Sequence, residues 1–316
     1  MAKVSIKNIV EQILEKEKIE YKTIKKSTSG FTNDVFFIDD RLVVKITNDH
    51  ETKKQLEKET YIYQNAQIRN IPAFIAGGEY EDYQYLIISK VKGVGLYSVW
   101  HELSEKQREN CVIQIAEILK NFNQIKPNFM PARYCYHNWK CHIIEKLTNR
   151  VGELKSQGYD ASVVEKLIQT DCGGVFDENN MGLVYNDAHF DNFIYNKETG
   201  NLTLIDFDRV IYGAKDYELL IFKTMCDNPL KFASEKDEEV VFKMDFEMVY
   251  DLFKQNYKEL FSEKHSAKRI MIYQFNYLLR QALAWKNSKA SLWVEKLLDD
   301  VKHLDDENYI LTSSVD

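Results

Sequence analysis

Short runs rich in β-branched and aromatic residues recur in the first 90 positions of the chain. Such runs predict β-strands. Five runs have this character, at residues 21–26, 34–38, 41–47, 74–80 and 83–89. Asp39-Asp40 and Glu81-Asp82 each separate two of these runs and predict tight hairpins. Amphipathic helices are expected at residues 6–18 and 52–67.

Beyond about residue 92 the apolar residues recur at helical spacing instead. Helices are predicted at residues 105–124, 136–155, 161–170, 216–226, 238–261, 268–286 and 291–304. One β-hairpin interrupts them, with strands at 193–195 and 202–205 and a turn at Gly200. The change in pattern predicts an α+β protein with a domain boundary near Lys92: a β-rich lobe at residues 1–92 and a larger, mostly helical lobe at 93–316.

The composition narrows the class of protein. A chain of 316 residues with 44% hydrophobic and 29% charged residues is typical of a globular protein with a sizeable core. The net charge is 42 − 49 = −7, which disfavours nucleic acid and anionic membranes as partners and mildly favours a cationic ligand. No run of 18 apolar residues occurs, and the first residues do not form a signal peptide. Five cysteines, an odd number, indicate reduced thiols and a cytoplasmic location.

Three polar side chains frame the hairpin in the helical part of the chain. Asn192 directly precedes its first strand and Asp206 follows its second. Because paired antiparallel strands run in opposite directions, Asn192 and Asp206 are expected at the same end of the hairpin. An amide oxygen and a carboxylate are hard ligands suited to magnesium. Asp187, on the preceding loop, remains available as a base.

A lysine in the third strand is the next candidate. The alternation of residues 41–47 places Lys45 and Val43 on the face opposite Leu42, Val44 and Ile46. Glu59 lies on the apolar stripe of the helix at 52–67, where a carboxylate is costly unless it is paired. Taken alone, these two residues are more typical of a surface lysine and a helical glutamate that never meet. Together with the downstream Asp/Asn/Asp set, they favour a strand-lysine and helix-glutamate pair.

The motif from Asp187 to Asn192, followed by Ile205-Asp206-Phe207, resembles the catalytic and metal-binding loops of the aminoglycoside phosphotransferase and choline kinase superfamily. His189 also matches, because that superfamily commonly has Asp-x-His-Pro-x-Asn at this position. Tyr185-Asn186-Asp187 departs from the usual His-Gly-Asp or His-Asn-Asp. The resemblance implies a two-lobe, protein-kinase-like fold with an antiparallel sheet in its N-terminal lobe. It also implies that Asp187 is catalytic and that Asn192 and Asp206 bind Mg²⁺.

The same resemblance implies further roles. Lys45, held by Glu59, would contact the nucleotide phosphates. The loop at residues 27–33, which includes Ser29, would cover these phosphates. Ser89 and Val91 would form a hinge that binds the base. ATP or GTP would be the phosphate donor. The segment Gly213-Ala-Lys-Asp-Tyr-Glu-Leu resembles one whose acid usually braces the catalytic loop. Three acids remain weak candidates for binding the acceptor: Asp191, Asp208 and Glu218.

The predicted activity is transfer of a nucleotide γ-phosphate to a hydroxyl of a small cationic acceptor, such as an aminoglycoside antibiotic. A choline-type or other metabolite kinase is an alternative, as is a non-catalytic nucleotide-binding module on the same fold. A metal-dependent phosphoesterase is a third alternative, using Asp187, His189, Asp191, Asp206 and Asp208. The cysteine and histidine cluster at residues 135–142 invites zinc, but its spacing fits no standard zinc finger. The acceptor and the oligomeric state stay open.

Overall fold

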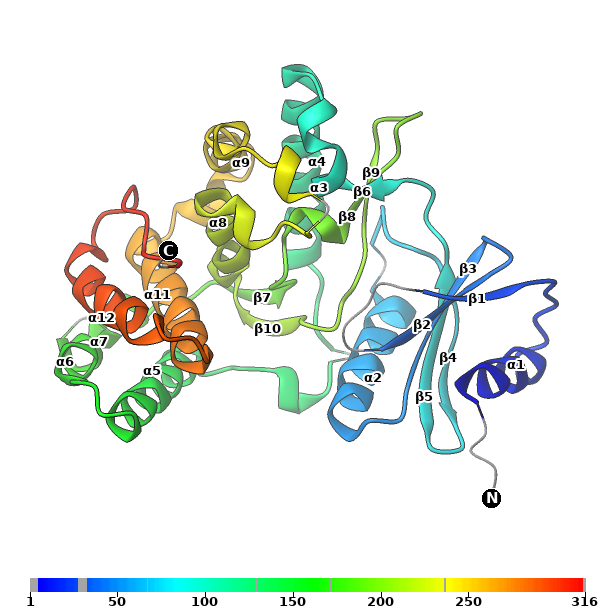
Figure 1. Ribbon diagram of the computed structural model, residues 1–316, viewed down its shortest axis with the longest axis horizontal. Helices are drawn as coiled ribbons and strands as arrows, with labels where there is room; N and C mark the ends of the chain where they lie inside the picture. The colour runs from blue at the N-terminus through cyan, green and yellow to red at the C-terminus, as the bar shows by residue number, and fades with distance from the viewer. Residues whose placement is uncertain are drawn as a thin grey trace. The chain divides into compact units, whose positions relative to one another are not determined.

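A five-stranded antiparallel sheet organises the N-terminal part of the chain (Figure 1). The computed structural model describes residues 5–27, 33–66, 68–128, 130–170, 172–235 and 237–314. The strands, in the spatial order β1-β2-β3-β5-β4, are β1 Ile24–Lys26, β2 Asp34–Ile38, β3 Leu42–Thr47, β4 Phe74–Tyr80 and β5 Tyr83–Ser89. Both predicted hairpins are confirmed. The β2–β3 turn places Asp39 and Asp40 in the left-handed region, at φ 49° and 56°, as tight two-residue hairpin turns require.

Two helices cover the two faces of this sheet. Val44 and Ile46 of β3 pack on one face together with Ile9 and Ile13 of α1 (Ile6–Lys16). On the other face, α2 (His50–Asn65) contacts β3, β4 and β5 (Figure 1). The alternation that buries Val44 and Ile46 under α1 therefore directs Lys45 toward α2. The side chain of Asp49 starts α2 by accepting hydrogen bonds from the Glu51 and Thr52 backbone N–H groups.

The predicted second hairpin is also confirmed. It consists of β8 (Phe193–Tyr195) and β9 (Leu202–Leu204), and β6 (Val94–Gly95) adds a third strand beside β8. Phe193 pairs with Leu204, so the residues just outside the hairpin, Asn192 and Ile205, are joined by a backbone hydrogen bond of 3.0 Å. Gly93, at φ 142°, approaches the hairpin so closely that a Cβ there would lie 2.4 Å from the Tyr195 carbonyl oxygen. Only glycine fits this position.

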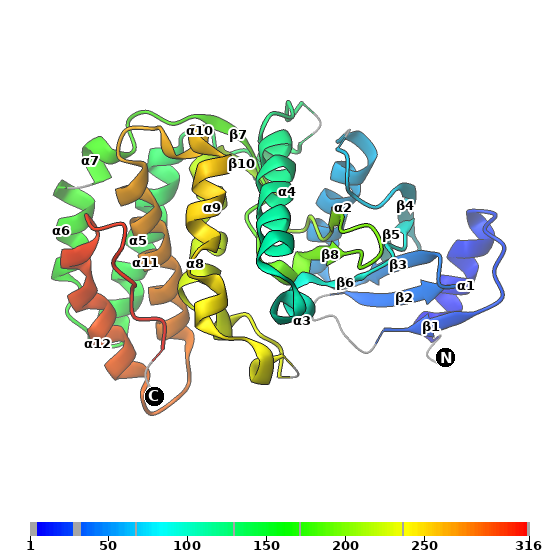
Figure 2. The ribbon, with the colours of Figure 1, turned by 90° about the horizontal axis from the view of Figure 1, so that it is seen from above.

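The rest of the chain is mostly helical (Figure 2). Its helices are α3 Leu96–Val99, α4 Glu105–Asn123, α5 Trp139–Ser156, α6 Ser162–Thr170, α7 Cys172–Val175, α8 Leu219–Asp227, α9 Val249–Asn256, α10 Lys258–Phe261, α11 Ser266–Ala284 and α12 Ala290–Asp300. The helix α11 has many buried residues and contacts α5, α8 and α12. No helix of the described residues is both long and apolar enough to cross a membrane.

Three features of the helical part differ from the sequence-based expectation. A two-stranded ladder, β7 (Met181–Val184) with β10 (Ile211–Ala214), was not predicted. The helix expected from residue 136 begins at Trp139, because the Asn138 side chain accepts the Cys141 N–H and caps it there. The single helix expected at 238–261 is wrong, since that stretch forms the short 3₁₀ turns Glu238–Val240 and Lys243–Phe246 before α9 and α10.

Two compact units divide the chain. The first contains residues 1–96, 128–132 and 190–210, and the second contains residues 97–127, 133–189 and 211–316. The hairpin of β8 and β9 therefore packs with the N-terminal sheet, although it lies far along the chain. Asp187 and Glu218 belong to the second unit. The assignment of nucleotide binding to residues 1–92 and acceptor binding to 93–316 stays a prediction.

A buried ion cluster holds the second unit together. Arg269 of α11 has no exposed surface and donates to the carboxylates of Asp216 and Glu263, each at 2.6 Å. It also donates to the Glu178 carbonyl oxygen at 2.6 Å. Asp216 in addition accepts the hydroxyl of Tyr273 at 3.2 Å. Arg269 thereby ties α11 to the segment that follows β10.

We expect Arg269→Met to lower the free energy of unfolding by about 3–5 kcal/mol, because it leaves the Asp216 carboxylate buried without its counter-charge. Chemical denaturation followed by circular dichroism measures this loss. Lys302→Met, which removes the exposed ion pair with Asp299, is the control and should leave the unfolding curve unchanged. Equal curves for both variants would show that the buried cluster does not hold the unit together.

Candidate active site

Lys45, Glu59 and Asp206 meet in the first unit. The Lys45 Nζ lies 2.8 Å from one Glu59 carboxylate oxygen and 3.0 Å from the other, and 3.0 Å from an oxygen of Asp206. The exposed fractions of the three side chains are 13%, 0% and 40%. Burial opposes a charged amine, but the carboxylates of Asp206 and Glu59 outweigh it, and the pKa of Lys45 lies well above its ordinary value. The predicted Lys45–Glu59 pair is thus present, and it extends to Asp206.

The end of the hairpin is fastened to α2 beside this cluster. The Phe207 N–H donates to Glu59 at 3.2 Å, and the Phe207 ring packs edge-on against Tyr63 with 5.0 Å between centroids. Asp206 itself has a left-handed backbone, at φ 63°, which is uncommon for a residue other than glycine. Such a conformation persists only where the surroundings impose it. Here Glu59 accepts the N–H of Phe207, the residue after Asp206, and the β8–β9 hairpin fixes the chain before Asp206.

Asn192 lies at the same end of the hairpin as Asp206. Its side chain is buried, with 7% of the residue exposed, and its backbone carbonyl accepts the Ile205 N–H. An amide oxygen and a carboxylate are ligands that fit Mg²⁺, which usually takes only one or two protein carboxylates and completes its shell with water and phosphate. The donor set of Asn192 and Asp206 is therefore chemically suited to this metal.

The loop that carries Asp187 is held by a buried carboxylate in the second unit. Glu218 has no exposed surface and accepts hydrogen bonds from the backbone N–H groups of Tyr185, at 2.8 Å, and Asn186, at 3.2 Å. Asn186 is left-handed, at φ 60°, so the loop turns sharply just before Asp187. These bonds use the backbone alone. The bracing interaction therefore does not depend on which side chain stands at position 185.

Asn123 and Tyr257 support Glu218, and sequence reasoning missed both. Asn123 donates to Glu218 at 3.2 Å and to the Leu183 carbonyl at 2.7 Å, and its own side-chain oxygen accepts the Tyr257 hydroxyl at 2.9 Å. An asparagine on an amphipathic helix and a tyrosine near a helix start are common in any sequence. No local signal distinguishes these two residues.

Asp187 has a neighbouring histidine within the same unit. The Nε2 atom of His189 lies 3.6 Å from a carboxylate oxygen of Asp187, beyond hydrogen-bonding distance, and the His189 N–H donates to the Asp187 carbonyl at 2.8 Å. The His189 ring packs against Phe232, with 5.9 Å between centroids. Asp187 is 17% exposed, so its carboxylate is accessible while its loop is fixed.

The remaining predicted residues fall into different surroundings. Ser29 lies outside the described residues. The Ser89 hydroxyl and N–H both bond the backbone of Ala73, at 2.8 Å and 2.9 Å, and so serve the sheet. Val91 has no hydrogen bond to another described residue, which leaves its backbone available to a ligand. Asp191 lies beside Gly95, and the charge of Asp208 acts on Lys58 of α2.

One expectation is corrected. Glu218 cannot contact an acceptor as arranged here, because it is fully buried and both its oxygens already accept hydrogen bonds from the loop. Among the described residues no group of three or more His, Cys, Asp or Glu side chains could hold a metal ion. His142 stacks on Tyr136 at 3.8 Å, and burial lowers its pKa to about 4.

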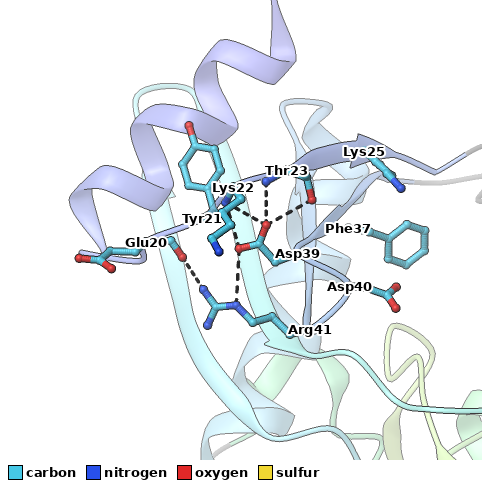
Figure 3. Close-up of a pocket in the computed structure, with 9 residues that line it drawn as sticks. All are labelled: Glu20, Tyr21, Lys22, Thr23, Lys25, Phe37, Asp39, Asp40 and Arg41. Carbon is cyan, nitrogen blue, oxygen red and sulfur yellow. Dashed lines mark hydrogen bonds and ion pairs between the residues drawn. The ribbon is translucent and has the colours of Figure 1, made fainter.

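A surface pocket on the first unit is separate from all of these residues (Figure 3). It has a volume of about 900 Å³ and is formed by residues 20–25 and the β2–β3 turn. Figure 3 shows the Asp39 carboxylate pointing to Lys22, Thr23 and Arg41. The Lys22 and Thr23 N–H groups donate to it at 2.9 Å and 2.7 Å. Asp39 therefore stabilises the turn, and the pocket contains no predicted site residue.

The sequence of residues 23–231 matches the phosphotransferase enzyme family. The chain belongs to this family. The match spans Lys45, Glu59, Asp187, Asn192 and Asp206, and it identifies the protein as an enzyme of the small-molecule kinase type. No curated protein matches the sequence at a significant level.

Solved structures share the fold at low sequence identity. The streptomycin–ATP ternary complex of APH(2″)-IIa is similar with a TM-score of 0.66 and 18% identity over 90% of this chain and 92% of that one. The GDP complex of aminoglycoside 2′-phosphotransferase-IIIa gives 0.67 and 16% over 96% and 99%. A putative fructosamine-3-kinase from Haemophilus somnus gives 0.60 and 16% over 93% and 96%. The predicted kinase-like fold is thereby confirmed.

The bracing carboxylate leads to a prediction about pH. Burial raises the pKa of Glu218 from 4.5 to about 7. Because the folded value lies above the unfolded one, its contribution to stability is complete below about pH 4.5 and is lost as the pH rises through about 7. The free energy of unfolding of the wild type, relative to Glu218→Gln, should therefore fall between pH 5 and pH 8.

Urea denaturation of both proteins at pH 5, 6, 7 and 8 measures this difference. Glu295→Gln, which alters an exposed carboxylate of α12, is the matched control and should parallel the wild type at each pH. A difference between wild type and Glu218→Gln that stays constant over the whole range would contradict the prediction.

Proposed function

We propose that the protein transfers the γ-phosphate of a magnesium-bound nucleotide to a hydroxyl group of a small cationic molecule, such as an aminoglycoside. The observation that carries this proposal is the Lys45–Glu59–Asp206 cluster. A lysine shared between a buried and an exposed carboxylate is arranged to bind phosphate. Glu59 keeps the amine charged and in place, and the exposed Asp206 stays accessible to a metal ion.

Each requirement of phosphoryl transfer has a candidate residue. Lys45 would bind the α- and β-phosphates, and Asn192 and Asp206 would hold Mg²⁺, which neutralises charge on the phosphates when bound. The free backbone of Val91 would pair with the edge of the base. Asp187 would orient the acceptor hydroxyl and receive its proton, with its loop kept rigid by Glu218.

The proposals for the phosphate donor and for the small-molecule acceptor rest on different observations. The similar structures contain ATP or GDP and include aminoglycoside-binding enzymes and a putative fructosamine kinase. The net charge of −7 favours a cationic acceptor. A metabolite kinase is the second candidate, because a fructosamine kinase shares this fold at comparable similarity. A panel of aminoglycosides, macrolides, choline and methylthioribose, each tested with ATP and with GTP, distinguishes the two by which acceptor stimulates nucleotide consumption.

We expect Asp187→Ala to lower the rate of transfer by about 10²–10⁴-fold, because the proton of the acceptor hydroxyl loses its base. Nucleotide affinity should be unchanged, since the proposed nucleotide contacts do not include Asp187. Steady-state kinetics and calorimetric titration with ADP measure the two quantities. The control is Asp251→Ala, which removes an exposed carboxylate of α9. Wild-type turnover in Asp187→Ala would remove Asp187 from the mechanism.

The ion pair between Lys45 and Asp206 predicts that metal binding depends on the nucleotide. While Lys45 is paired with Asp206, a cation must displace the ammonium group to reach the carboxylate. Lys45→Met should therefore bind Mn²⁺ more tightly than the wild type in the absence of nucleotide, yet bind ATP more weakly. Asp206→Ala should lose metal-dependent nucleotide binding. Mn²⁺ titration followed by electron paramagnetic resonance measures the first effect, and equal Mn²⁺ affinities would show that Lys45 does not compete with the metal.

A further inference from the structure

Four exposed apolar side chains gather on the segment between α8 and α9. Leu230, Phe242, Met244 and Met248 are 56%, 54%, 72% and 61% exposed, and no other large apolar side chain among the described residues exceeds 44%. Leu230 belongs to the 3₁₀ turn Pro229–Lys231, which contacts the turn Lys243–Phe246. We call these four residues the exposed apolar surface. Single exposed apolar residues are ordinary, but a local group of them marks a binding surface.

The segment that carries this surface is firmly anchored (Figures 1 and 2). Arg108 of α4 donates to the Asp245 carboxylate at 2.6 Å, and the Trp100 indole donates to the Asp245 carbonyl at 3.0 Å. Phe246 is buried and packs against the rings of Tyr97 and Trp100. Buried anchors therefore alternate with exposed apolar residues, and the exposure of Phe242, Met244 and Met248 is a fixed feature of the fold.

The same segment touches the catalytic loop within the second unit. The Phe232 ring, two residues after Leu230, packs against His189 with 5.9 Å between centroids. His189 is two residues from Asp187 in sequence and 3.6 Å from its carboxylate. A molecule whose hydroxyl reaches Asp187 thus lies close to the start of this segment.

The charge of the segment is negative. Glu235, Glu238, Glu239 and Glu247 are exposed and form no ion pair with any described residue. On the described part of the segment, Lys243 is an exposed cation, whereas Lys231 is turned toward Trp293, with its Nζ 4.7 Å from the ring centroid. Exposed carboxylates beside apolar side chains complement a ligand that is both cationic and apolar.

We propose that the exposed apolar surface binds the non-reacting part of the acceptor, and that the acceptor is an amphiphilic cation whose apolar portion packs against Phe242, Met244 and Met248. This inference rests on the proposed phosphotransfer to a hydroxyl group and specifies the acceptor class. Methionine side chains are flexible and polarisable, and they suit apolar ligands of irregular shape. The acidic residues around them supply the attraction for the ammonium group.

A homologous series of acceptors tests the proposal directly. In N-alkyl-N,N-dimethylethanolammonium ions the hydroxyl and the charge stay constant while one alkyl chain lengthens from methyl to octyl. For the full chain with Mg²⁺ and ATP, kcat/KM should rise at least about tenfold along the series, through KM, because each buried methylene adds hydrophobic stabilisation. Calorimetric titration with the same compounds should show the same trend in affinity.

The triple variant Phe242→Ser, Met244→Gln, Met248→Gln should abolish this dependence on chain length, so that its kcat/KM no longer rises from the methyl to the octyl compound. Because all three positions are exposed, the variant should fold. Leu292→Gln, at a 44% exposed position on α12, is the matched control and should keep the dependence. Glu238→Gln combined with Glu239→Gln should weaken binding of the octyl compound, and this effect should diminish at high salt.

Several results would overturn the inference. Transfer only to polar polyamines, a flat dependence on chain length, or equal slopes in wild type and triple variant would show that the surface does not select the acceptor. A change in sedimentation of the triple variant without a change in kcat/KM would show that the surface joins two copies of the chain. Failure of every acceptor, aminoglycosides included, would instead contradict the proposed function, and calorimetric binding of the octyl compound would still report on the surface.

Discussion

The arrangement of the first compact unit depends on one buried ammonium group that is shared between two carboxylates. Lys45 comes from a central strand, Glu59 from the helix that covers the sheet, and Asp206 from the end of a hairpin more than a hundred positions later. A charge in the interior is tolerated only when its partners are in place. The register of β3, the rotation of α2 and the length of the β8–β9 hairpin must therefore all be correct together. The close approach of Gly93 to Tyr195 fixes the third β-strand of that hairpin sheet to the same unit.

The second unit uses a different device to fix the loop that carries Asp187. Glu218 holds two successive backbone N–H groups, and Asn123 and Tyr257 complete its surroundings. A brace that acts on the backbone is insensitive to the side chain that follows the strand. This explains how tyrosine can occupy position 185, where its ring packs edge-on against Phe122. The conformation of the loop that carries Asp187 therefore does not depend on the side chain at position 185.

Much of this arrangement could be predicted from the sequence, because its signals are local. The period of two in β3 and the apolar stripe of α2, together with the downstream Asp/Asn/Asp set, predicted the pair of Lys45 and Glu59. The turn at Gly200 predicted that Asn192 and Asp206 lie at the same end of the hairpin. The prediction was wrong where distant contacts decide the conformation. Residues 238–261 have helical spacing, but Arg108 and Trp100 hold Asp245 in a 3₁₀ turn. Likewise, the partners of Glu218 come from α4 and the start of α10, and no pattern along the chain connects them.

In the segment between α8 and α9, some residues maintain the fold and others face outward. Asp245 and Phe246 secure it to α4 and to the aromatic residues near Trp100, whereas Phe242, Met244 and Met248 contribute little to folding because they are exposed. Mutations at the outward positions are thus nearly neutral for folding free energy, and selection can act on them separately. Side chains at such outward positions can change without compensating changes in the core.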